Sequence, residues 1–153
     1  MYTLTYSQNL PLTLEQAWEF ISSPKNLKTI TPEFMGFDII SSIEEKMYAG
    51  MIIQYKVRPI LHIPIHWVTE ITHVQEPFFF VDEQRFGPYS LWHHQHHFKA
   101  IPGGVCMEDI VHYKIPFAFL GDIAQTLFVK KQLKGIFDHR FQAVVDKWGT
   151  YKP

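Results

Sequence analysis

The stretch that decides the fold is residues 122–148, DIAQTLFVKKQLKGIFDHRFQAVVDKW, near the C-terminal end of the chain. Large apolar side chains recur in it at intervals of three and four residues, which is the spacing of one face of an α-helix. The members of this face are Leu133, Phe137, Phe141, Val144 and Trp148. The pattern predicts one long amphipathic helix over residues 122–148, and its apolar face needs another element to cover it.

Upstream of this helix, runs of alternating apolar and polar residues predict strands, because alternate side chains of a strand point to opposite faces of a sheet. Seven strands are expected, at residues 2–9, 37–43, 51–58, 66–74, 78–85, 89–100 and 105–115. The connections between them are short, which indicates antiparallel neighbours. Two short helices are predicted after the first strand, one begun by the capping-box pair Thr13 and Gln16 and one by Ser23 and Pro24.

The expected fold class is therefore α+β. A strongly curved, seven-stranded antiparallel sheet is expected to wrap around the C-terminal helix, within a single domain of residues 1–153. At this length the chain can bury roughly 68–70% of its unfolded surface, which is enough for a sizeable core.

Composition narrows the class of protein further. The formal net charge is -1, so there is no global attraction toward nucleic acid or an anionic membrane. Cys106 is the only cysteine, which excludes an internal disulfide and suits a reducing compartment. No apolar run is long enough to span a membrane, and the first residues lack the pattern of a signal peptide. We therefore expect a cytoplasmic protein, and the sequence says nothing about a protein partner.

Several short motifs resemble a known family. They lie at residues 30–32, 35–37, 55–57, 63–64, 67, 71, 80–84, 87–89, 92–94, 96–98, 103–104, 109–113, 116 and 121. In these residues, and in the order of its elements, the chain resembles the SRPBCC superfamily, the START-related domains that share a helix-grip fold with the birch pollen allergen. Within it, the chain is similar to the bacterial polyketide-cyclase-like and ligand-binding proteins. The resemblance implies a ligand cavity between sheet and helix but no particular chemistry.

Histidines are concentrated in the run HHQHH at residues 93–97. On a strand, His94 and His96 share a face with Trp92 and Phe98, and this aromatic face is expected to be the inner one. Two histidines at this spacing could supply two metal ligands. A catalytic zinc site needs a third protein ligand, and neither an HExxH motif nor clustered cysteines accompany them. We therefore expect no metal and no cofactor.

Asp109 is the candidate partner of these histidines. It shares a face of the seventh strand with Met107, Val111 and Tyr113, and an inward carboxylate must be paired or protonated. The sixth and seventh strands form a hairpin, so Asp109 could lie near His94 or His96. Such a group could transfer protons, which makes these three residues the catalytic candidates, but a structural hydrogen bond is the simpler explanation.

The fifth strand has two possible registers. If Phe80 faces inward, Asp82 and Gln84 join the polar part of the cavity. If the strand slips by one residue, Val81, Glu83 and Arg85 face inward instead. We prefer the first register because Phe80 then continues the inner aromatic layer.

The function that these observations favour is non-catalytic binding of a hydrophobic small molecule, such as a lipid, an isoprenoid or a polyketide. The expected apolar wall consists of Trp67, Phe80, Trp92, Phe98, Tyr113, Leu133, Phe137 and Phe141. The expected polar contacts come from Asp82, Gln84, His94, His96 and Asp109. The first alternative is a cyclase, dehydratase or hydrolase that uses the cavity histidines and Asp109 as general acid and base. The second is a protein-interaction module whose cavity is filled by its own aromatic side chains.

Overall fold

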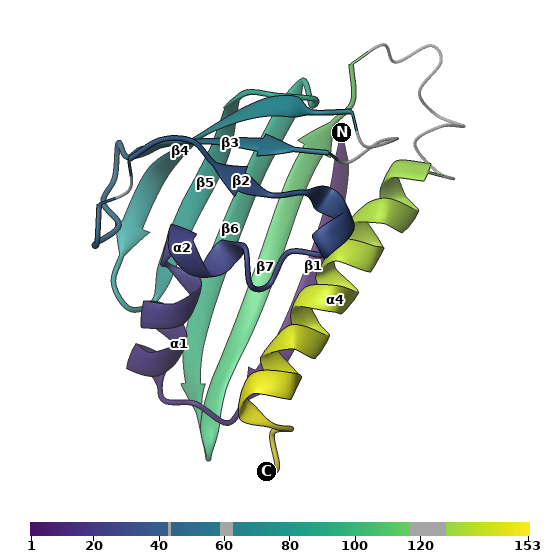
Figure 1. Cartoon of the computed structure of the whole chain (residues 1–153). Helices are drawn as coiled ribbons and strands as arrows, with labels where there is room; N and C mark the ends of the chain where they lie inside the picture. The colour runs from purple at the N-terminus through teal and green to yellow at the C-terminus, as the bar shows by residue number, and fades with distance from the viewer. Residues whose placement is uncertain (43, 59–62, 117–127) are drawn as a thin grey trace.

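The computed structural model describes residues 1–42, 44–58, 63–116 and 128–153 of the chain. Seven strands form one antiparallel sheet in the order β1-β7-β6-β5-β4-β3-β2 (Figure 1). The strands are β1 (Tyr2–Leu10), β2 (Asp38–Ile39), β3 (Ile52–Val57), β4 (Ile65–Gln75), β5 (Phe79–Phe86), β6 (Leu91–Ile101) and β7 (Gly104–Lys114). The predicted α+β class and the antiparallel sheet are confirmed.

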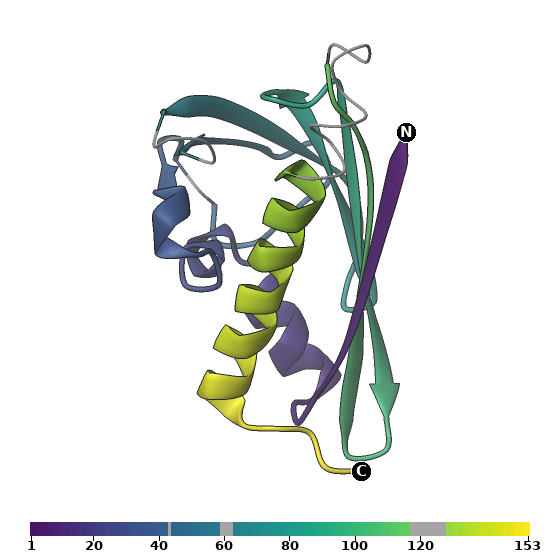
Figure 2. The ribbon, with the colours of Figure 1, turned by 90° about the vertical axis from the view of Figure 1, so that its right-hand side faces the viewer.

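The sheet is strongly bent where β4 pairs with β5. Two irregularities interrupt their register, one between Val68 and Thr69 and one between Ile71 and His73. An extra residue on one strand of an antiparallel pair bends that strand and increases its twist. Figure 2 shows the result, in which the β3–β4 end of the sheet leans over the helix that lies on its concave side.

That helix is α4 (Lys130–Trp148), the long C-terminal helix predicted from the sequence. Residues 122–127, where the predicted helix begins, lie outside the described residues. The helix is fastened to β1 by the stacked rings of Tyr6 and Phe137, whose centroids are 4.4 Å apart. The Gln8 side-chain amide also donates a 3.2 Å hydrogen bond to the carbonyl oxygen of Phe141.

Two short helices follow β1, as predicted: α1 (Leu14–Ile21) and α2 (Pro24–Leu27). The capping box of α1 is present, because Thr13 Oγ1 accepts the Gln16 N–H at 3.2 Å and Gln16 Oε1 accepts the Thr13 N–H at 3.0 Å. A single 3-10 turn, η1 (Glu33–Met35), then leads into β2. In Figure 1 these helices lie on the same side of the sheet as α4.

Strand β2 is much shorter than the predicted residues 37–43. Its pairing with β3 ends because the Gln54 N–H donates to Ser41 Oγ at 3.1 Å, so a side chain replaces the backbone acceptor that a longer strand would supply. The alternation of Ile39, Ser41 and residue 43 predicted a longer strand, because it does not show that the Ser41 side chain takes the place of a backbone acceptor.

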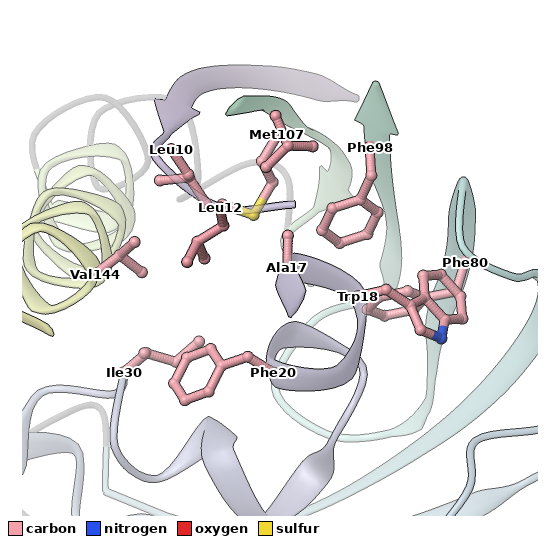
Figure 3. Close-up of a cluster of buried hydrophobic side chains, with 11 residues drawn as sticks. Leu10, Leu12, Ala17, Trp18, Phe20, Ile30, Phe80, Phe98, Met107 and Val144 are labelled. Carbon is pink, nitrogen blue, oxygen red and sulfur yellow. The ribbon is translucent and has the colours of Figure 1, made fainter. Parts of the chain in front are cut away.

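The largest apolar cluster among the described residues joins α1 and the C-terminal half of α4 to β1, β5, β6 and β7. Figure 3 shows this cluster of buried side chains, in which Trp18 of α1 lies edge-on to both Phe80 and Phe98. The cluster comprises Leu10, Leu12, Ala17, Trp18, Phe20, Ile30, Phe80, Phe98, Val105, Met107 and Val144. It fills one end of the space between the sheet and α4, and the candidate site lies next to it, toward β3 and β4.

Candidate functional site

A cavity of about 250 Å³ lies between the concave face of the sheet and α4. Its wall is mostly apolar and combines side chains from the β3–β4 region, from the loop before β6 and from the helix. Aliphatic and aromatic members include Met35, Phe37, Ile53, Val57, Ile71, Tyr89, Ile115 and Ile136. This hollow is the space that the sequence predicts between sheet and helix.

Eight of the thirteen predicted ligand-contacting residues line this cavity. They are Trp67, Phe80, Asp82, Trp92, His94, His96, Leu133 and Phe137. Phe80 and Asp82 face the interior, which is the preferred register of the fifth strand. Arg85 of the other register lies outside, where it pairs with Glu70 and Glu83.

The other five predicted residues lie elsewhere. Gln84 holds the turn before β6, because its side chain accepts the Tyr89 N–H and donates to the Tyr89 carbonyl oxygen. Phe98 is packed in the cluster around Trp18, and Tyr113 packs with Val111 in a separate buried cluster. Asp109 is buried behind the two cavity histidines.

Phe141 does not line the main cavity and is 47% exposed. In a helix of 3.6 residues per turn, each step of four residues rotates the side chain by about 40°, so the series Leu133, Phe137, Phe141 drifts off the sheet-facing side. The inward face continues instead through Arg140 and Val144, of which Arg140 lines the cavity and Val144 is fully buried.

The polar part of the wall is a closed cluster of two histidines between two aspartates. His94 Nε2 lies 2.8 Å from Asp109 Oδ1, and His96 Nε2 lies 2.9 Å from Asp82 Oδ2. The second nitrogens complete the ring, with His94 Nδ1 3.4 Å from Asp82 Oδ2 and His96 Nδ1 2.9 Å from Asp109 Oδ1. This last approach is not aligned for a hydrogen bond, although it is short. The imidazole centroids are 3.8 Å apart.

His94, His96 and Asp109 are almost completely shielded from water and the Asp82 side chain is 17% exposed, and burial together with their mutual contacts moves their pKa values apart. Burial alone would raise the pKa of both carboxyl groups, but the adjacent histidines outweigh it and hold the pKa of Asp82 and of Asp109 below the ordinary value. Burial lowers the pKa of His94, and the neighbouring His96 lowers it further. Burial also opposes the charged form of His96, but its contacts with both aspartates outweigh this and raise its pKa.

These shifts favour the charged form of both carboxyl groups and make His96 the more basic of the two imidazoles. The predicted split of the histidine run is confirmed by burial, since His94 and His96 are 4% and 5% exposed. The outward residue His93 is only part-buried and bonds to Glu83 instead. The predicted proximity of Asp109 to His94 and His96 is also confirmed.

Several polar cavity residues escaped the sequence analysis, among them Tyr55, Thr69 and Arg140. Tyr55 and Thr69 join their hydroxyl groups in a short hydrogen bond, and the Trp67 indole N–H donates to the same Thr69 oxygen at 3.1 Å. Arg140 of α4 lines the cavity, and its guanidinium lies 5.3 Å from the Phe137 ring centroid. Tyr55 and Thr69 lie two residues from the inward Ile53 and Ile71, on the same faces of β3 and β4, and Arg140 lies seven residues after Leu133. The two-residue alternation of the strands and the seven-residue repeat of the helix could therefore have identified these residues as inward-facing.

A metal ion would find its most suitable ligands in this cluster. Among the described residues, Asp82, His94 and His96 each offer one ligand atom, and these atoms lie within 4.8 Å of one another.

Solved structures with the same fold are numerous, although sequence comparison alone finds little. No family model and no curated protein matches the sequence. A START superfamily protein from Mycobacterium smegmatis superposes with a TM-score of 0.69 at 12% identity, covering 97% of each chain. Protein CV1439 from Chromobacterium violaceum gives 0.73 at 9% identity, covering 97% of this chain and 98% of the other. Ara h 8.0201 gives 0.64 at 14% identity, covering 95% and 98%.

The chain has the helix-grip fold, which it shares with these solved structures. The sequence resemblance implied this fold, and the superpositions confirm it over nearly the whole chain. Among the described residues, no helix combines the length and apolar character needed to cross a membrane.

Proposed function

We propose that this protein binds a compact, largely apolar small molecule in the cavity between the sheet and α4. The observation that carries the proposal is the cavity itself, about 250 Å³ and walled mainly by apolar side chains. Small-molecule sites are usually concave, mostly apolar and equipped with a few placed polar groups. The helix-grip fold supports the proposal because it leaves room between its two layers.

The cavity volume selects among the candidate ligands. Small-molecule pockets usually measure about 300–1,000 Å³, so this cavity lies at the small end of the range. A short acyl chain, a small isoprenoid or a single polyketide ring suits it better than a sterol-like body. Burial of their apolar surface supplies about 25 cal/mol per Å², which is the main driving force for binding.

The polar groups give the ligand an orientation. Asp82, His94 and His96 meet the cavity on the sheet side, and Arg140 meets it from the helix. A ligand with one polar end would place that end against these groups and its apolar body toward Trp67 and Ile71. The proposed binder is therefore an amphipathic molecule with one polar end.

The first test is native mass spectrometry of freshly purified protein, followed by titration with octanoate, dodecanoate and hexadecanoate. We expect the shorter acids to bind more tightly than hexadecanoate because of the cavity volume. Ile136→Trp places a large ring in the cavity and should abolish binding of all three. Phe141→Trp enlarges a ring on the same helix but away from the main cavity. This variant should bind the acids as the unmodified protein does. Equal binding by both variants would overturn the proposal.

Acid–base catalysis is the second candidate function, and the buried histidine–aspartate cluster is the observation that favours it. His94 lines the cavity, and burial together with the neighbouring His96 lowers its pKa, which favours the unprotonated imidazole that a general base requires. If the protein is an enzyme, His94→Ala should abolish turnover of a bound ligand and leave its affinity nearly unchanged. If polar substitutions change affinity alone, catalysis is ruled out. A protein-interaction module with a filled interior has less support, because the interior is not filled.

A further inference from the structure

Three ligand atoms of one polar cluster face the same point in the cavity wall. They are Asp82 Oδ2, His94 Nδ1 and His96 Nε2. We propose that these three atoms bind a divalent first-row transition-metal ion of the Zn²⁺ or Fe²⁺ type. Two imidazoles with one carboxylate form a ligand set that suits both ions, whereas Ca²⁺ and Mg²⁺ prefer oxygen ligands.

The spacing of the ligand atoms fits such an ion. Zinc lies about 2.0–2.2 Å from nitrogen and oxygen ligands, so two ligands at angles between about 90° and 109° are separated by roughly 2.9–3.5 Å. Asp82 Oδ2 lies 2.9 Å from His96 Nε2 and 3.4 Å from His94 Nδ1. Both separations fall within the range expected for atoms that share one metal.

Asp109 supplies the second observation, because it lies on the far side of both imidazoles. Its Oδ1 is 2.8 Å from His94 Nε2 and 2.9 Å from His96 Nδ1. Metal-binding histidines almost always present their other nitrogen to a carboxylate or carbonyl group, which fixes the tautomer and turns the free lone pair toward the metal. Here Asp109 hydrogen-bonds to His94 and lies close to His96 Nδ1, and the other nitrogen of each imidazole lies within 3.4 Å of Asp82 Oδ2.

The charges of the cluster also suit a divalent cation. Asp82 and Asp109 together contribute two negative charges in a region shielded from water. Without a metal, the three converging acceptors depend on protons, and His94 Nδ1 faces Asp82 at the longer distance of 3.4 Å. A divalent ion would neutralise both carboxylates and satisfy all three acceptors at once.

Three protein ligands leave coordination positions open, and all three residues line the cavity, so those positions face it. Arg140 lines the same cavity and contributes one positive charge. Its Nε is buried and has no hydrogen-bond partner within the described part of the chain. A ligand with an anionic oxygen could therefore bind the metal and the guanidinium together.

The sequence analysis did not expect this site because it found only two ligands, His94 and His96, on one strand. The third comes from the neighbouring strand, where Asp82 is in register with His94. Both residues were placed on the inner face, but alternation along one strand does not specify the pairing between strands.

The test is titration of the metal-free protein with Co²⁺, followed by visible absorption spectroscopy, and with Zn²⁺ by calorimetry. We expect one ion per chain and intense Co²⁺ bands. Asp82→Asn and His94→Gln should abolish this binding, and Asp109→Asn should weaken it by about 10–100-fold, as loss of an orienting partner does. The matched control is the double variant His93→Gln, His97→Gln, which removes the outward histidines of the same strand and should leave the titration unchanged.

Loss of binding in this control, or retention in Asp82→Asn and His94→Gln, would overturn the proposal. If a buried substitution prevents folding, histidine NMR of the unmodified protein with diamagnetic Zn²⁺ decides the question. Only the ring signals of His94 and His96 should shift, and shifts confined to His93, His97 or His112 would contradict the site. The titration needs no organic ligand, so its failure leaves the proposed apolar binding intact.

Discussion

Thr69 holds two aromatic side chains of the cavity wall in place through one hydroxyl group. It is 2% exposed and hydrogen-bonds with the Tyr55 hydroxyl and the Trp67 indole N–H. Burial raises the pKa of Tyr55, and the negative charge of Asp82 raises it further, so the phenol stays protonated. The residue lies beside the first irregularity between β4 and β5, where the sheet bends over the helix.

Thr69→Val should reduce the free energy of unfolding by about 1–3 kcal/mol, because the isosteric change leaves two buried polar groups with fewer partners. Urea denaturation monitored by tryptophan fluorescence measures this difference. Thr5→Val is the matched control, since Thr5 is exposed on β1 and should change stability by no more than about 0.5 kcal/mol. Equal effects of the two substitutions would show that Thr69 has no special role.

Alternation along single strands predicted the inward residues well. His94, His96, Asp109 and Phe80 all point inward, because the period of two is a property of the strand itself. Distances across the sheet depend on the register between paired strands, and the sequence of one strand does not specify that register. The sequence therefore located Asp82 on the correct face without showing that it reaches both histidines.

At the scale of elements, α4 was recognised from its apolar spacing, and three residues of its predicted face, Leu133, Phe137 and Val144, are buried. Phe141 was wrongly placed on this face, and Ile136 and Arg140, which line the cavity, were not assigned to it. Sequence patterns predicted the structure more accurately where all the residues involved lie within one helical turn. The capping box at Thr13 requires only residues of its own turn, and it is present as predicted.

Two glycines should respond in opposite ways to alanine. A methyl group on Gly104 would overlap the carbonyl oxygen of Leu10, whereas one on Gly135 meets no described atom within 4 Å. Gly104→Ala should therefore destabilise the protein by about 1–3 kcal/mol through overpacking. Gly135→Ala should stabilise it by about 0.5–1 kcal/mol, because alanine loses less backbone entropy in a helix.

Thermal unfolding followed by circular dichroism measures both changes, and each variant serves as the control for the other. If Gly135→Ala lowers the melting temperature, the glycine has a role in close packing that the open space around it does not indicate. If Gly104→Ala is tolerated, the β6–β7 turn must shift away from Leu10.

The whole molecule is a bent sheet with unequal pairing along its width. Strands β6 and β7 pair over eleven residues each, whereas β2 pairs with β3 through Asp38 and Ile39. The largest apolar cluster of the described residues also joins β6 and β7 to α1 and α4. The cavity occupies the side where this packing is thinner, toward β3 and β4.

Native-state hydrogen exchange should follow this division. Amides of β6 and β7 should exchange most slowly, close to the rate set by global unfolding, and those of β2 and its partners on β3 should exchange fastest among the strands. Mass spectrometry of peptides after timed deuterium exposure provides the measurement. Equal protection of β2 and β7 would contradict the view that the cavity side is the less stable half.

The order of the elements and the helix-grip fold could be predicted because they rest on local periodicity and on a resemblance that spans the chain. The cavity volume could not, since it is the difference between two large packed surfaces. Whether aromatic side chains fill such a space or only line it depends on rotamers and on the bend of β4, neither of which a residue pattern specifies.

The C-terminal end of α4 is anchored by two contacts, so a movement that opens the cavity would have to take place at the other end of the helix. Beyond the helix, the Tyr151 hydroxyl donates to the Pro102 carbonyl oxygen at 2.6 Å, and Trp148 packs edge-on to Phe20 with centroids 4.5 Å apart. A tilt of the helix would therefore turn about its C-terminal end, which lies beside the β6–β7 turn. The nineteen residues of α4 span about 28 Å, so a tilt of about 10° moves Lys130 by roughly 5 Å while Trp148 stays in place. For the proposed ligand binding, such a tilt would open the cavity at the Lys130 end of α4 and leave the contacts at its C-terminal end in place.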